Sequence, residues 1–148
     1  MIDPGIAQTV RDSFSSQGAM RALGATIATL DDGFCELRMP YAEAVAQQHG
    51  YFHGGVIAAL GDSAGGYAAN TKLMPERECL TAEYKINMLT PAQGEWLVAR
   101  GRVVRPGRSL VVVVVDLFAS QAGQERHCAL MQMTLFAVTS RPLSGRAG

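Results

Sequence analysis

The segment from residue 53 to residue 73 constrains the fold most, because it is strongly apolar and yet contains five glycines. Its larger apolar residues recur at the spacing of a helix: Val56, Ile57, Leu60, Ala64, Tyr67 and Ala68. Each glycine inside a helix costs about 0.5–1 kcal/mol relative to alanine. A helix that tolerates this cost is stabilised by burial, so we expect a buried helix with other backbone packed close against it.

The second half of the chain has the pattern of strands. Between Leu80 and Met88, apolar residues alternate with polar ones at a period of two, and Pro91 ends the pattern. We therefore expect Thr81 and Glu83 to share one polar face. Further strands are expected over 96–104, 110–119 and 127–138, with a hairpin connection at 105–108. Together these strands predict an antiparallel meander.

The remaining segments fit around this helix and sheet. We expect an N-terminal helix within residues 1–22, a strand pair or one long bent strand over 25–39, a loop over 40–52 and a flexible tail over 141–148. No repeat or linker divides the chain, so residues 1–148 are expected to form a single domain. The predicted fold class is α+β, with the sheet wrapped around the glycine-rich helix.

Composition and charge exclude several classes of function. The chain of 148 residues carries 13 basic and 13 acidic side chains, which gives no electrostatic argument for a nucleic-acid or anionic-membrane partner. Its longest strongly apolar run, 110–115, is far shorter than the ~20 residues of a membrane-spanning helix. The start does not resemble a signal peptide, and the three cysteines are scattered. We therefore expect a cytoplasmic protein.

Asp62 is the strongest candidate for chemistry, because it lies within the apolar helix. A buried carboxylate without a partner is costly and tends to have a raised pKa. One interpretation is that Asp62 hydrogen-bonds a neighbouring backbone group. The functional interpretation is a carboxylate positioned as a base or as a nucleophile.

The sequence His53-Gly54-Gly55 stands at the expected start of this helix. Free N–H groups in a first helical turn favour developing negative charge, and glycine allows close approach of a carbonyl. An ordinary glycine-rich helix start is the alternative. Gly54 and Asp62 are eight residues apart, or about 12 Å along one helix. A small carbonyl group cannot contact both, so their cooperation would require two chains related by a two-fold axis.

Two other motifs are poor candidates for chemistry. Residues 61–65 spell GxSxG, but no strand–turn–helix pattern supports Ser63 as a nucleophile. His49 and His53 lie four residues apart, but the glycines around them and the lack of a third ligand argue against a metal site.

A group of arginines surrounds the predicted hairpin: Arg100, Arg102, Arg105 and Arg108. No acidic residue lies among them in the sequence. The group fits either a solvated hairpin or a site for phosphate, which arginine binds well. Gly107 and Ser109 could add backbone and hydroxyl donors.

From about residue 20 to residue 140 the sequence resembles the hotdog-fold acyl-CoA thioesterases of the phenylacetate-degradation (PaaI) type, which are related to 4-hydroxybenzoyl-CoA thioesterases. The most specific match runs from His53 to Asp62, where an HGG is followed by an acid nine residues after the histidine. Residues 81–92 resemble the strand after the helix, with its terminal proline turn. Residues 101–109 resemble the hairpin that contacts coenzyme A in relatives.

The resemblance implies a role for each matching residue. Asp62 corresponds to the catalytic base or nucleophile, Gly54 to the N–H donor for the thioester carbonyl, and His53 to the residue that orients this loop. Thr81 corresponds to a residue that holds the attacking water. The site amide corresponds to Gln47, with Gln48 an equally plausible occupant. The implied substrate-binding residues are Gly55, Gln48, Ser63, Glu83, Arg105, Gly107, Arg108 and Ser109.

The resemblance also sets the expected partners. It implies an acyl-CoA substrate with an aryl or medium-chain acyl group, no cofactor and no metal, and a homodimer that pairs into a homotetramer. Gly66 stands where a related branch has threonine, so the acyl pocket is expected to differ. The alternatives are a non-catalytic acyl-CoA-binding module and a hotdog hydratase or dehydratase.

Overall fold

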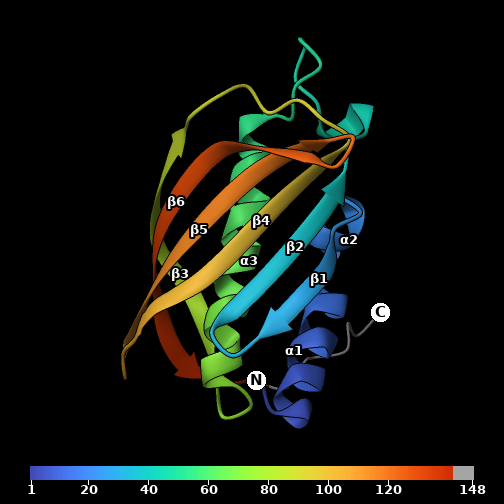
Figure 1. The fold of residues 1–148 in the computed structure, drawn as a ribbon. Coiled ribbons are helices and arrows are strands. Elements are labelled where there is room, and N and C mark those ends of the chain that lie inside the picture. Colours follow the sequence, from blue (N-terminus) through green and yellow to red (C-terminus); the bar gives the residue numbers. More distant parts are fainter. Residues whose placement is uncertain (142–148) are drawn as a thin grey trace.

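The computed structural model describes residues 1–141 (Figure 1). Its elements are α1 (Pro4–Ser16), α2 (Gly18–Ala22), β1 (Thr26–Asp31), β2 (Phe34–Pro40), the 3-10 helix η1 (Glu43–Val45), α3 (Gly54–Leu73), β3 (Arg77–Met88), β4 (Trp96–Pro106), β5 (Leu110–Gln121) and β6 (Gln124–Thr139). Except for Arg141, the expected tail over 141–148 lies outside the described residues. None of the helices in residues 1–141 has the length and apolar character needed to cross a membrane.

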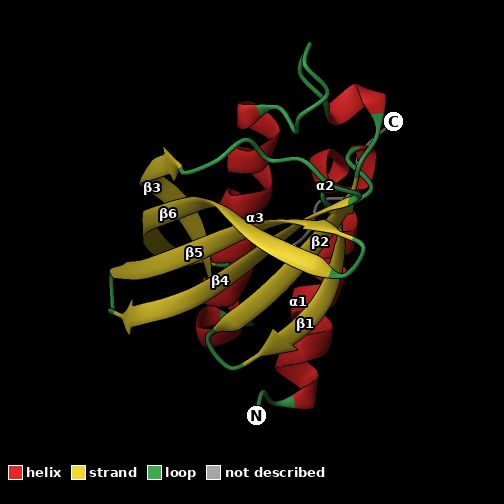
Figure 2. Ribbon diagram, turned by 45° about the horizontal axis from the view of Figure 1, so that its top comes forward, coloured by secondary structure: helices red, strands yellow, loops and turns green. Residues whose placement is uncertain are grey.

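The six strands form one antiparallel sheet in the order β1-β2-β4-β5-β6-β3. The sheet curves around α3, as Figures 1 and 2 show, and α1 lies beside β1. This arrangement confirms the expected α+β layout. The expected meander is correct only for β4, β5 and β6, because β3 pairs with β6 at the far edge. The connection over 89–95 is long enough to cross the end of the sheet before β4 begins.

The backbone of α3 packs directly against the backbone of β4, whereas the space beside Gly61 and Gly65 of α3 is filled by sheet side chains such as Met131 and Met133. At Gly101 of β4, an added Cβ atom would lie 2.5 Å from the carbonyl oxygen of Ala64 in α3. The side chains of β5 that face the helix are completely buried at Val111, Val113, Val115 and Leu117. The buried helix predicted from the glycine-rich segment is therefore confirmed, and its start at residue 54 agrees with the expected range.

The N-terminal helical region is interrupted at Gln17, so it forms α1 and α2 in place of one helix. Gln17 has extended backbone angles (φ −78°, ψ 106°), and its side-chain oxygen accepts a hydrogen bond from Ser63 at 3.2 Å. The region over 25–39 is a strand pair, with Gly33 at φ 73° in the turn. A single bent strand is thereby excluded.

The alternation predicted for β3 is wrong beyond Thr81. Thr81 pairs with the buried Leu135, but the next paired residue is Glu83, which lies opposite Thr134. Ala82 is therefore the extra residue of a β-bulge, which reverses the facing of every residue after it. Thr81 faces α3, whereas Glu83 lies on the outer face of the sheet.

Candidate active site

His53 forms the N-cap of α3 and leaves one backbone N–H free. Its Nδ1 accepts a hydrogen bond from the Gly55 N–H at 2.9 Å, and its carbonyl oxygen accepts from the N–H groups of Val56 and Ile57. Within residues 1–141, the Gly54 N–H has no acceptor. It is therefore available to an external oxygen at the positive end of a 20-residue helix.

A pocket of about 480 Å³ opens at this helix start. Its lining residues are Gln47, Tyr51, Phe52, Gly54, Ile57, Met88, Leu89, Thr90, Pro91 and Ala92. Gln47 lines the pocket, whereas Gln48 is exposed and does not. The side-chain oxygen of Gln47 accepts a hydrogen bond from the His49 N–H, which leaves its amide nitrogen as a donor. The pocket is thus mainly apolar with polar donors near Gly54.

Asp62 lies in the middle of α3 and contacts β3. The Thr81 hydroxyl donates a hydrogen bond to Asp62 Oδ1 at 2.7 Å, while Oδ2 has no donor among the described residues. The carboxylate is half-buried, so the expectation of a fully buried group is wrong. Because the bulge at Ala82 follows Thr81, the strand can present this hydroxyl toward α3 before its facing changes.

Ser63 and Glu83 point away from the Asp62 carboxylate. Ser63 is buried, and its hydroxyl donates to Gln17 at the junction of α1 and α2. Glu83 accepts a hydrogen bond from Thr134 at 3.3 Å on the outer face of the sheet. The expected polar face shared by Thr81 and Glu83 is therefore wrong, because the bulge separates their directions.

Cys79 is a neighbour of Asp62 that the sequence analysis did not select. Its thiol donates to the Gly66 carbonyl oxygen at 3.2 Å. Burial, together with the negative charge of Asp62, raises the pKa of Cys79 to about 12, so this thiol stays protonated. The sequence signal that could have identified Cys79 is its position two residues before Thr81, which places both side chains on the same face of the strand. Gly66 and Cys79 together form a small, uncharged wall beside the carboxylate.

The arginine group separates into two parts in space. Arg100 of β4 contacts Glu36 of the neighbouring strand β2 at 2.7 Å and Glu125 of β6, two strands away, at 2.8 Å. It also lies over the Phe118 ring of β5, the strand between β4 and β6. The expectation of a cluster without acids is therefore wrong for Arg100, because its partners are distant in sequence. In the described residues, Arg105 and Arg108 make no ion pair.

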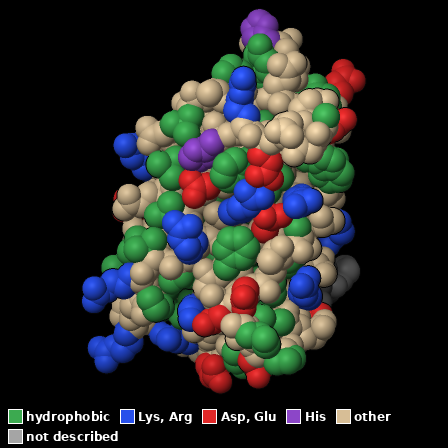
Figure 3. All heavy atoms as spheres, in the orientation of Figure 1, with side chains coloured by type: hydrophobic (Ala, Val, Ile, Leu, Met, Phe, Trp, Pro, Cys, Tyr) green, Lys and Arg blue, Asp and Glu red, His purple; other side chains and the backbone are tan. Residues whose placement is uncertain are grey.

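The hairpin that carries Arg105 and Arg108 lies away from the start of α3 (Figure 1). Gly107 makes the turn possible, since an added Cβ atom would overlap the Leu110 carbonyl oxygen at 2.2 Å. Ser109 accepts a backbone hydrogen bond from Ala137. Basic side chains gather at the lower left of the face in Figure 3, over the ends of β4 and β5. One chain therefore holds its free N–H and its basic hairpin at different ends.

Gly54 and Asp62 are also separate within one chain. They lie eight residues apart on one continuous helix, about 12 Å by the helical rise, and Asp62 does not line the pocket at Gly54. Across residues 1–141, no three His, Cys, Asp or Glu side chains gather in a way that could hold a metal ion.

Residues 49–125, which are more than half of the chain, match the family described as the thioesterase superfamily. The chain belongs to the thioesterase superfamily. A thioesterase family protein from Silicibacter pomeroyi, known from its crystal structure, is 47% identical and covers 91% of this chain and 99% of its own, with a TM-score of 0.89. Two further relatives are the acyl-coenzyme A thioesterase PaaI of Escherichia coli (25% identity, covering 77% of this chain and 80% of PaaI) and the 1,4-dihydroxy-2-naphthoyl-CoA hydrolase of Listeria monocytogenes (26% identity, 64% and 77%).

Membership of this superfamily confirms the resemblance found in the sequence. The thioesterase has the hotdog fold, in which the curved sheet surrounds α3, and its activity class is thioester hydrolysis. The matched residues include His53, Gly54, Asp62 and Thr81. The individual roles of these residues stay predictions.

Proposed function

We propose that this thioesterase hydrolyses the thioester bond of an acyl-CoA at a site built by two copies of the chain. The observation that carries the proposal is the separation along α3 of the free Gly54 N–H from the Asp62–Thr81 pair. Neither group suffices alone, because one polarises a carbonyl and the other activates water. The printed activity of the relative PaaI, an acyl-coenzyme A thioesterase, supports the substrate class.

The open edge of β3 supports the dimer. This strand of 12 residues is the last of the sheet, and exposed apolar side chains accompany it at Leu80 (59% exposed), Tyr84 (45%) and Met88 (49%). A long apolar edge strand readily pairs with another strand. If β3 pairs with its own copy across a two-fold axis, each α3 lies antiparallel to the other. Gly54 of one copy then approaches Asp62 of the other.

The proposed reaction needs no group beyond these residues and water. The thioester oxygen accepts a hydrogen bond from the Gly54 N–H of one copy, and the side-chain amide N–H of Gln47 donates a hydrogen bond beside it. Asp62 of the other copy takes a proton from water through its free oxygen, while Thr81 holds the first oxygen. The water oxygen bonds to the carbonyl carbon, the carbon–sulfur bond breaks, and the CoA sulfur leaves and takes up the proton.

The pocket supports an aryl or medium-chain acyl group. The pocket has a volume of about 480 Å³, its lining includes Phe52, Ile57 and Met88, and no charged side chain lines it.

Three free cysteines, all within residues 1–141, support a location in the reducing cytoplasm.

Thiol release from aryl-, short-, medium- and long-chain acyl-CoA esters tests the proposal. The wild type should release thiol, and Asp62→Asn should lower kcat by at least about 100-fold while ester binding is retained. Binding of esters without thiol release by the wild type would refute the proposal in favour of a binding module. Hydration of an enoyl-CoA in place of thiol release would refute it in favour of a hydratase.

Single-turnover hydrolysis in ¹⁸O-labelled water tests whether Asp62 acts as a nucleophile. A base leaves the protein unlabelled, whereas a nucleophile forms a mixed anhydride, and water that attacks its aspartyl carbon leaves ¹⁸O in the carboxylate. We expect label in the released acid alone. Label in Asp62 would replace the base mechanism by the nucleophilic one.

We propose that the hairpin with Arg105 and Arg108 binds the CoA phosphates. Both side chains are exposed cations without a carboxylate partner in the described residues, and this supports phosphate binding. Replacing either by alanine should raise KM by about tenfold with little change in kcat. Arg126→Ala, a change at an exposed arginine on β6, is the matched control. Unchanged KM in both hairpin variants would remove them from the site.

We further propose that two dimers pair through the outer face of the sheet. Leu110 and Phe136 are direct neighbours across β5 and β6, with 44% and 51% exposure, and Leu80 lies next to Phe136. An exposed apolar patch of this kind supports a second interface. Phe136→Glu should sediment as a dimer and keep its thiol release. A tetramer of this variant would contradict the assignment.

A further inference from the structure

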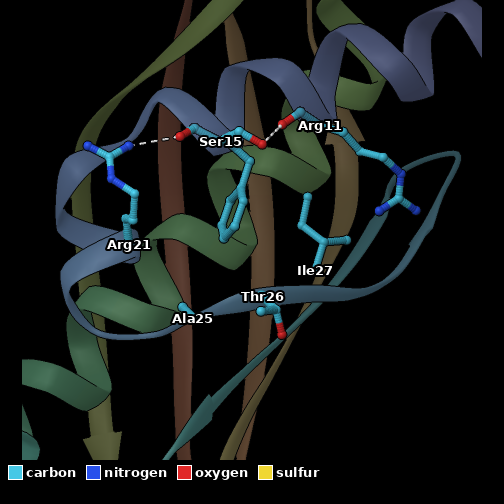
Figure 4. A pocket seen from close by; sticks show the side chains of 7 residues that line it. Arg11, Ser15, Arg21, Ala25, Thr26 and Ile27 are labelled. Atoms are coloured by element: carbon cyan, nitrogen blue, oxygen red, sulfur yellow. Dashed lines mark hydrogen bonds between the residues drawn. The ribbon is translucent and has the colours of Figure 1, made fainter.

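A second pocket, outside the proposed site, lies between the N-terminal helices and the edge strand β1. Its volume is about 420 Å³, and its lining residues are Arg11, Phe14, Ser15, Arg21, Ala25, Thr26 and Ile27 (Figure 4). None of these residues lines the pocket at Gly54. The proposed hydrolysis does not use it. We call it the α1–β1 groove.

The centre of the α1–β1 groove is apolar and fixed by packing. Phe14 from α1 and Ile27 from β1 are both half-buried against the core, and Ala25 is buried between their elements. The Phe14 ring packs edge-on against Tyr67 of α3, with 5.3 Å between ring centroids and an interplanar angle of 73°. This contact holds the aromatic wall in place, so the groove is preformed.

A guanidinium group lies at each end of the α1–β1 groove. Figure 4 shows Arg11 and Arg21 at opposite ends, with Ile27 between them. Arg21 donates a hydrogen bond to the Ser15 carbonyl oxygen at 2.9 Å, which holds its side chain at the groove. Ser15 is four residues from Arg11, or about 6 Å along the helix axis. Within residues 1–141, neither arginine pairs with a carboxylate, and no acidic residue lines the groove.

We infer that the α1–β1 groove binds an α,ω-dicarboxylate with a hydrocarbon chain between its two ends. A planar guanidinium donates two parallel N–H groups to a carboxylate, so each arginine can hold one end of the ligand. The methylene chain then contacts Phe14 and Ile27, and its burial adds to the affinity. A monocarboxylate would satisfy one arginine and leave an apolar tail beside the other cation. The volume lies within the range of small-molecule sites.

Residues of α1 and of its junction with α2 connect the wall of the α1–β1 groove to α3, although no α3 residue lines the groove itself. Phe14 contacts Tyr67 of α3, and Gln17, at the junction of α1 and α2, accepts a hydrogen bond from Ser63, which follows Asp62. The inference of a dicarboxylate site does not depend on whether two copies share the hydrolytic site.

Titration calorimetry with three probes of equal chain length tests the inference: suberate, octanoate and 1,8-octanediol. The wild type should bind suberate at least about tenfold more tightly than octanoate, and the diol should not bind. Arg11→Gln and Arg21→Gln should each lower the suberate affinity by about tenfold and remove its advantage over octanoate. Both arginines are exposed, so these variants should fold, and Arg126→Gln is the control for overall charge.

Backbone amide spectra locate the binding site. Suberate should shift the resonances of residues 25–27 in the wild type, and both groove variants should need about tenfold more suberate for the same shift. Three results would overturn the inference: no saturable suberate binding, equal affinities for suberate and octanoate, or shifts confined to the residues around Gly54. Failure of thiol release with normal suberate binding would affect the proposed function alone.

Discussion

At the residue scale, the backbone N–H of Gly54 can be deleted without disturbing the helix that carries it. Residue 54 is the first residue of α3, where proline is favoured, and His53 already has the extended conformation that precedes a proline (φ −64°, ψ 136°). Gly54→Pro should lower kcat by about 100- to 1000-fold, as expected for loss of one oxyanion donor. Thiol-release kinetics measure the change.

Gly54→Ala is the matched control, because it retains the N–H. Its added Cβ atom would lie 3.5 Å from the terminal methyl of Met88, which is an ordinary contact. Its kcat should therefore remain much closer to that of the wild type. Equal losses in the alanine and proline variants would exclude the N–H as the catalytic group.

At the scale of elements, the contact of α3 with β4 limits what can replace glycine. Gly101→Ala would place a methyl group 2.5 Å from the Ala64 carbonyl oxygen, and backbone on both sides prevents an easy adjustment. We expect a loss of about 1–3 kcal/mol in the free energy of unfolding. Gly66→Ala is the comparison: its Cβ atom would meet Cys79 Sγ at 3.7 Å, and alanine favours the helix. Urea unfolding that ranks Gly101→Ala above Gly66→Ala in stability would contradict this packing argument.

A second prediction for the sheet concerns acid stability. Burial would raise the pKa of Glu36, but hydrogen bonds from Arg100 and Arg38 lower it below its ordinary value of 4.5. A lowered folded-state pKa contributes stability above the unfolded-state value, and this stability is lost as the pH falls through the folded-state value. Thermal unfolding between pH 6 and pH 3 should therefore depend less on pH in Glu36→Gln than in the wild type. The control is Glu43→Gln, because the exposed Glu43 makes no ion pair among residues 1–141. Its thermal unfolding should depend on pH as strongly as that of the wild type.

Much of this architecture was predictable because local patterns carry it. The glycine-rich segment implied a buried helix, and the residues over 25–39 implied either a strand pair, which is what forms, or one bent strand. The bulge at Ala82 was not predictable. The extra residue leaves the alternation of apolar and polar residues intact in the sequence, but in the structure it exchanges the two faces of the sheet for the residues that follow. The acids that pair with Arg100 could not be predicted either, because Glu36 and Glu125 come from other strands and are distant in the sequence. The motif from His53 to Asp62 was readable, whereas the direction of Glu83 depended on the bulge.

At the scale of the whole molecule, the proposal of a shared site predicts recovery of activity from two inactive variants. Gly54→Pro removes the donor and Asp62→Asn removes the base, so each homodimer should be nearly inactive. A mixed dimer contains one site with both defects and one site with neither, because each site takes Gly54 from one copy and Asp62 from the other. Unfolding and refolding the two variants together gives mixed dimers in about half of the population, so about a quarter of the wild-type thiol release should return. If each chain held a complete site, every site in the mixture would keep one defect, and no activity would return. The amount recovered therefore decides whether the distance along α3 is bridged by a second copy.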